Sequence, residues 1–147
     1  MLNAATIRIS GTVSPAGIEF QADGPVDLAV DSTTGGSIAI PDDGMTIEAD
    51  GYGGIIESPI TSGTNSIGLT VTGNGPLTLT GSNGFNGGTH IEQDAVVEVS
   101  SAASLGDGGL TLDDGTLDLN ANSISVTSLA AGDGLRWQGS QSRSRTG

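Results

Sequence analysis

The chain has 147 residues, of which 17 are acidic and 4 are basic, and its formal net charge is −13 at pH 7. This acidic composition argues against nucleic acid as a partner, because phosphate binding depends on clustered Lys and Arg side chains. Cysteine is absent, which excludes disulfide staples, thiol catalysis and cysteine-based zinc sites.

The composition favours thin, stacked β-layers over a compact globule. Glycine accounts for 25 residues and only 3% of the chain is aromatic. Such a chain can fill a narrow core with Val, Ile and Leu and use glycine in its turns. Disorder is the competing interpretation, but a hydrophobic share of 35% with sustained period-two alternation argues against it.

The N-terminus, residues 1–6, lacks the basic region and the apolar run of a secretory signal. No apolar run approaches the roughly 20 residues needed to span a membrane as a helix. We therefore expect no direct membrane insertion by this segment. If the chain is exported, it is an internal piece of a longer polypeptide; a stand-alone short reading frame is the alternative.

The first half of the chain alternates apolar and polar residues in short runs. Proline at position 15 indicates a turn over residues 12–15, and Gly-Pro, Gly-Gly and Pro-Asp-Asp-Gly sequences mark later turns. The pattern predicts short strands at residues 6–10, 16–21, 26–30, 38–40, 45–47, 55–60 and 67–71.

The stretch from residue 77 to residue 120 has the most regular pattern and predicts five short strands. Its apolar residues recur at period two, and the alternate positions are small or acidic, as expected for strands with one buried face. The apolar set is Leu77, Leu79, Ile91, Val97, Val99, Leu110, Leu112, Leu117 and Leu119.

This stretch resembles the autotransporter-associated β-strand repeat, found in the secreted passenger regions of bacterial autotransporters. The Leu-x-Leu-Thr-Gly-x-Asn opening of that family matches residues 77–83. Its aromatic-x-Gly-Gly-Thr-x-Ile segment matches residues 85–91, and its Leu-Gly and Gly-Thr-Leu elements match residues 105–106 and 115–117. One departure is visible: where the family has a turn glycine, this chain has Asp94-Ala95, so the turn must use an aspartate.

The pattern of about fourteen short strands without helical periodicity allows a sandwich, an antiparallel barrel or a parallel β-helix. The small-residue corners, the aliphatic filling and the family resemblance favour the last. We predict an all-β protein, a right-handed single-stranded parallel β-helix (β-solenoid) fragment of roughly six rungs. It occupies residues 1–135 as one domain, with the signature repeat at 76–120.

The last segment, residues 136–147, differs from the rest because it holds three arginines and no acidic residue. Leu135 and Trp137 could complete a final strand, but residues 139–147 contain no apolar side chain. We expect a disordered basic tail over residues 136–147, either a vector-derived or out-of-frame ending or a genuine terminus that touches an acidic neighbour.

The sequence predicts no catalytic, cofactor-binding or metal-binding residue. His90 is the single histidine, and strand alternation points it outward. Two carboxylate pairs, Asp42-Asp43 and Asp113-Asp114, lie in Asp-Asp-Gly turns, where aspartate bonds its own backbone. A polysaccharide hydrolase or lyase would need carboxyls facing each other across a cleft. The chain lacks the companion His, Lys and aromatic residues that such clefts use.

Calcium is the remaining metal hypothesis. Residues 106–113 loosely resemble the glycine-aspartate nonapeptide that binds Ca²⁺ in repeat toxins. The spacing of that motif is not met and no consecutive copies follow, so we interpret these residues as a solvated turn.

The resemblance implies a structural, extracellular, rod-like passenger segment on the bacterial cell surface that serves as a stalk or as an adhesion or self-association surface. The expected partners are adjacent rungs of a longer parent polypeptide, other cell-surface proteins or a second copy. The alternative is a β-helix binding module for a glycan or host ligand. Its aromatic residues, Phe20, Tyr52, Phe85 and Trp137, are too scattered to predict a flat aromatic binding face.

Overall fold

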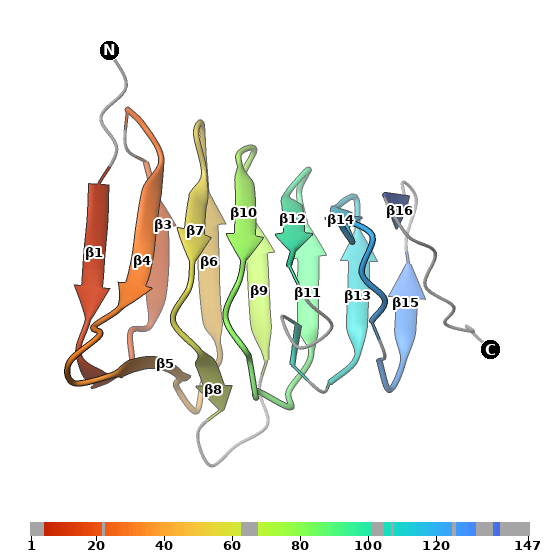
Figure 1. Cartoon of the computed structure of the whole chain (residues 1–147). Helices are drawn as coiled ribbons and strands as arrows, with labels where there is room; N and C mark the ends of the chain where they lie inside the picture. Colours follow the sequence, from red (N-terminus) through yellow and green to blue (C-terminus); the bar gives the residue numbers. More distant parts are fainter. Residues whose placement is uncertain are drawn as a thin grey trace.

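The computed structural model describes residues 5–21, 23–62, 68–100, 105–106, 108–124, 126–131 and 137–138. In these residues the chain forms strands and no α-helix. All pairs of strands run parallel, and the chain winds through them as stacked coils (Figure 1). The prediction of a parallel β-helix is confirmed.

Three sheets form the sides of the coils. The seven-stranded sheet contains β1 (Ala5–Ile9), β4 (Val26–Val30), β7 (Gly54–Ile56), β10 (Pro76–Leu79), β12 (Val96–Val99), β14 (Thr116–Asp118) and β16 (Trp137–Gln138). The six-stranded sheet contains β3 (Gly17–Phe20), β6 (Met45–Ala49), β9 (Leu69–Thr72), β11 (Thr89–Glu92), β13 (Leu110–Asp113) and β15 (Leu129–Ala131). The three-stranded sheet contains β2 (Gly11–Val13), β5 (Gly36–Ile40) and β8 (Ile60–Ser62).

The strand register shows how long each coil is. Leu77, Val97, Leu117 and Trp137 hold equivalent positions, so each coil in this part of the chain takes 20 residues. The earlier coils are longer and unequal, as their equivalent positions Ala5, Val26, Gly54 and Leu77 show. The regular part of the solenoid therefore coincides with the stretch whose sequence pattern is most regular.

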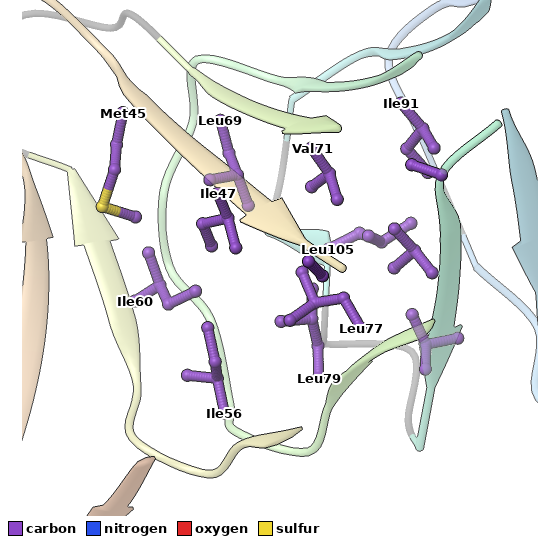
Figure 2. Packing of buried hydrophobic residues seen from close by; sticks show 14 of the residues in the cluster. Met45, Ile47, Ile56, Ile60, Leu69, Val71, Leu77, Leu79, Ile91 and Leu105 are labelled. Carbon is purple, nitrogen blue, oxygen red and sulfur yellow. The ribbon is translucent and has the colours of Figure 1, made fainter. Parts of the chain in front are cut away.

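A single aliphatic core is enclosed by the three sheets, and Ile38, Ile40 and Ile60 of the three-stranded sheet belong to it (Figure 2). Inward side chains stack on the same position of the next coil, as in the row Leu28, Ile56, Leu79 and Val99. Each of these is at least nine-tenths buried. Burial of one Val, Ile or Leu side chain stabilises the fold by about 1.5–3 kcal/mol, so the stacked rows are the main source of stability.

Two predicted segments in the first half differ from the structure. The single strand expected over residues 55–60 is divided into β7 and β8, because the chain turns a corner at Glu57–Pro59 between the two sheets. The turn expected over residues 12–15 begins later, because β2 extends to Val13. At residues 57–59 the Glu-Ser-Pro sequence marks the break that the prediction did not use. At residues 11–13 a short second strand follows β1 after a single residue.

The glycine-free turn of the signature repeat adopts the predicted strained backbone. Gln93 and Asp94 have φ values of 56° and 64°, in the left-handed region that non-glycine residues rarely occupy. The Asp94 N–H donates to the carbonyl of Asp114, which itself has a φ of 61°. The corners of neighbouring coils thus repeat the same left-handed geometry and bond to each other.

The third side of the solenoid changes after β8. In the next coil, Asn83 and Gly84 bond to β8 in place of a strand. Asn83 Oδ1 accepts a hydrogen bond of 2.8 Å from the Ile60 N–H, and the Gly84 N–H donates to the Ile60 carbonyl at 2.9 Å. Asn83 is 6% exposed. An asparagine side chain therefore replaces a strand in holding this coil on the three-stranded sheet.

Apolar side chains are exposed at the N-terminal end of the described chain. On β1 and β2, Ile7 is 53% exposed and Val13 is 39% exposed, and β1 forms one edge of its sheet (Figure 1). At the other end, Trp137–Gln138 form β16 and pair with β14. The basic tail predicted from residue 136 thus includes two residues of a strand; residues 139–147 lie outside the described residues.

The equal length of the later coils predicts that one of them can be removed. Deletion of residues 97–116 joins position 96 to position 117, which is its natural successor in register. We expect this variant to keep a β-sheet circular dichroism spectrum and cooperative unfolding, and small-angle scattering to show a rod shorter by about 4.8 Å. Deletion of residues 97–106, half a coil, is the control and should abolish cooperative unfolding; equal damage by both deletions would contradict the modular fold.

The Asn83 contact predicts a second, local effect. Asn83→Leu keeps the side-chain volume but leaves the buried Ile60 N–H without its acceptor, which should lower the free energy of unfolding by about 1–3 kcal/mol. Urea denaturation measures this. Asn74→Leu is the matched control, because its Oδ1 accepts from the exposed Gly51 N–H, which water can satisfy. A similar loss in both variants would show that the buried bond has no special weight.

Candidate functional site

An open groove of about 680 Å³ runs across the starts of the strands of the six-stranded sheet. It crosses from Ala16, just before β3, to Ser128, just before β15, and so spans consecutive coils. In Figure 1 the starts of β9, β11, β13 and β15 lie in one row along the lower edge of this sheet. The groove therefore follows the long axis of the solenoid rather than the direction of a strand.

Glycine at one equivalent position forms the floor of the groove. The residues directly before β6, β9, β11 and β13 are Gly44, Gly68, Gly88 and Gly109. A Cβ atom on Gly68 would lie 2.2 Å from the Gly88 carbonyl oxygen, and one on Gly109 would lie 2.4 Å from Ser128 Oγ. At Gly68 a side chain would collide with backbone, so the floor there consists of backbone, and Gly109 packs closely on the Ser128 hydroxyl.

Hydroxyl groups form the wall. The wall is made by the second residue of each of β6, β9, β11 and β13. These residues point outward and pair in register, and they are Thr46, Thr70, His90 and Thr111. Among the described residues, the hydroxyls of Thr46, Thr70 and Thr111 have no hydrogen-bond partner in the protein. Three equivalent donor-acceptor groups therefore face solvent along the groove.

His90 interrupts this row of threonines. As the sequence predicts, its side chain points outward, and it is 41% exposed. Its Nε2 atom lies 3.5 Å from Glu92 Oε2 and forms no hydrogen bond there. In the described part of the chain, no serine or threonine hydroxyl is hydrogen-bonded to the His90 ring, and Glu92 is the charged group beside it.

The carboxylate pairs lie where the sequence places them, in turns. Asp42 and Asp43 fall between Pro41 and Gly44, whose N–H donates to the Pro41 carbonyl at 2.9 Å. Asp113 ends β13 and Asp114 follows it at the left-handed corner. All four side chains are exposed, and only Asp43 lines the groove, so neither pair faces the other across a sugar-sized cleft.

The calcium hypothesis concerns residues 106–113, of which Asp107 lies outside the described residues. Gly106 has a φ of 69° and packs closely on Phe85. Within the described ranges, no three His, Cys, Asp or Glu side chains are grouped closely enough to hold a metal ion. The glycines of this segment serve close coil-to-coil packing.

The outer face of the six-stranded sheet carries a second row, and this row is acidic. Glu19 and Glu48 are register partners on β3 and β6. The negative charge of Asp50, together with desolvation and the charge of Glu19, raises the pKa of Glu48 above its ordinary value. In-register stacking thus brings like charges together on the surface.

One acidic side chain instead stabilises a corner. Asp31 Oδ1 accepts hydrogen bonds from the backbone N–H groups of Thr33 and Thr34, at 2.8 and 3.0 Å. These bonds hold the pKa of Asp31 below its ordinary value. Asp31 therefore shapes the turn between β4 and β5 rather than a binding site.

The aromatic residues do not form a binding face in the described structure. Phe20 and Phe85 are 3% and 0% exposed and belong to the core, whereas Tyr52 is 52% exposed in a turn. Phe85, which the sequence placed in the family motif, fills the interior of a coil. A stacking platform for sugars or bases is therefore not provided by these three rings.

Sequence reasoning missed the groove. The signal that could have found it is the glycine immediately before a strand followed by a small or β-branched outward residue, as in Gly68-Leu-Thr and Gly109-Leu-Thr. The two segments are 41 positions apart in sequence, and β11 lies between their strands in the sheet. Only the register of the coils shows that they line the same groove.

The described residues contain no helix of the length and hydrophobicity required to cross a membrane. Comparison of the chain with protein-family models, with curated proteins and with solved structures gave no match. The resemblance to the autotransporter-associated repeat therefore depends on the residues quoted above and enters the functional argument as a proposal.

The raised pKa of Glu48 predicts a pH-dependent gain in stability on its neutralisation. At pH 7 the native state holds Glu48 against like charges, so Glu48→Gln should raise the melting temperature. The advantage should shrink as pH falls through the Glu48 pKa, because the native wild-type carboxyl then binds its proton more readily than the unfolded one.

Glu57→Gln is the matched control, since it removes the same charge from an exposed corner. Thermal unfolding at a series of pH values compares the two variants. If both raise the melting temperature equally, general charge reduction rather than the Glu48 environment is responsible.

Proposed function

We propose that the chain is a structural segment of an extracellular, rod-like bacterial surface protein, acting as a stalk or as an adhesion or self-association surface. The observation that carries the proposal is the in-register stacking of coils around one continuous aliphatic core. Each coil contacts its neighbours through parallel backbone hydrogen-bond ladders, and every coil adds the same kind of contacts. A protein with more coils is therefore a longer rod with the same cross-section.

The exposed apolar end supports the same proposal. Ile7 and Val13 are exposed, whereas their register partners Leu28 and Ile38 are buried. Among the described strands, β1 and β2 are edge strands that pair on one side only. A further coil in parallel register would bury both side chains and pair with the other side of both strands. The geometry thus suits a segment of a longer stack.

The surface chemistry is consistent with display outside a cell. A net charge of −13 favours solubility and disfavours nonspecific association. The family resemblance of residues 76–120 supports the assignment to a bacterial autotransporter passenger. We propose a non-catalytic role, because the carboxylate pairs and His90 lie apart from one another in exposed turns and on an open sheet face.

Surface labelling of the organism that encodes the chain tests this function. Antibodies raised against the purified chain should bind intact cells, and external protease should remove the signal. A cytoplasmic protein probed on the same cells controls for lysis. If antibody binds only after the cells are permeabilised, the protein is not displayed and the proposal is wrong.

A further inference from the structure

We propose that the groove across the six-stranded sheet binds a linear, uncharged oligosaccharide that lies along the solenoid axis. This site goes beyond the stalk function and does not depend on it. The inference rests on the shape of the groove, on the chemistry of its walls and on the backbone groups that are already used.

The length and direction of the groove suit a linear polymer. From the coil of Ala16 to the coil of Ser128 the groove makes five coil-to-coil steps, or about 24 Å at about 4.8 Å per step. Three of the four wall positions on β6, β9, β11 and β13 carry a hydroxyl, and the fourth is His90. A ligand with one polar group per repeating unit of similar length can meet several of them at once.

The free polar groups of the groove are side-chain hydroxyls, not backbone. The carbonyls of Gly88, Gly109 and Ser128 accept hydrogen bonds of 3.0, 2.8 and 2.9 Å from the N–H groups of the preceding coil. An extended peptide would find no free strand edge here. A sugar chain, whose hydroxyls donate and accept, matches the unpaired hydroxyls of Thr46, Thr70 and Thr111.

Charge decides between neutral and anionic sugars. Asp43 is the only acidic residue that lines the groove in the described structure, and His90 is the only histidine. The adjacent outward row carries Glu48, Glu92 and Asp113. These carboxylates make the electrostatic potential beside the groove negative, which repels anions. The groove therefore favours an uncharged sugar chain over a polyuronate.

The test uses the full chain and six-unit probes. Cellohexaose and xylohexaose are the neutral probes, hexagalacturonate is the anionic probe, and a Ser- and Gly-rich peptide of similar length is the peptide probe. In ¹H–¹⁵N correlation spectra at millimolar ligand, we expect at least one neutral sugar to shift the amides around Thr70, His90 and Thr111. Hexagalacturonate and the peptide should cause no shift.

Paired substitutions keep the result specific. Thr70→Val with Thr111→Val removes two wall hydroxyls at nearly constant volume and should weaken binding on the order of tenfold. Thr80→Val with Thr116→Val changes two threonines outside the groove and should leave affinity unchanged. Circular dichroism confirms that both variants fold.

Three results would overturn the proposal: no shift with either neutral sugar, binding of the peptide or hexagalacturonate in their place, or equal affinities of both double variants. The first two reject the ligand class and the third rejects the groove. None of these results bears on surface display, which the antibody experiment measures independently.

Discussion

The parallel hydrogen-bond ladder between coils is the constraint on which the rest of this structure depends. It holds each residue beside its equivalent on the next coil at about 4.8 Å. Inward positions then become continuous aliphatic rows, and outward positions become rows of hydroxyls or of carboxylates. The core, the groove and the acidic surface all result from the same in-register stacking of the strands.

This registration has a cost as well as a benefit. Identical apolar residues pack well when they stack, but like charges repel. The pKa of Glu48 is raised mainly by Asp50 on the same coil and by desolvation, and the stacked Glu19 adds to the effect. Where a strand is missing, a side chain must supply its hydrogen bonds, as Asn83 does for Ile60. The fold therefore tolerates irregular sequence only where a specific contact restores the ladder.

Much of the fold could be predicted from the sequence, because period-two alternation fixes which side chains face inward. The five strands of residues 77–120 and the left-handed turn at Asp94 follow from local pattern and turn chemistry. Alternation alone did not separate a β-helix from a sandwich or barrel, since all three have strands with one buried face. The small-residue corners, the aliphatic filling and the family resemblance together favoured the β-helix.

The candidate site was not predictable in the same way. Gly68, Gly88 and Gly109 are unremarkable turn residues in the sequence and become a groove floor only when coils are stacked. The undivided strand predicted at residues 55–60 was wrong for a different reason. The Glu-Ser-Pro sequence at 57–59 breaks the apolar run, and its proline is a local turn signal that the prediction did not use. Features created by non-local register need the register itself.

The constant spacing of Leu77, Val97 and Leu117 also has a genetic consequence. A recombination event that duplicates one such unit in frame inserts a whole coil and leaves every neighbouring contact type intact. Recombination between misaligned units would yield alleles that differ in rod length but share the same cross-section.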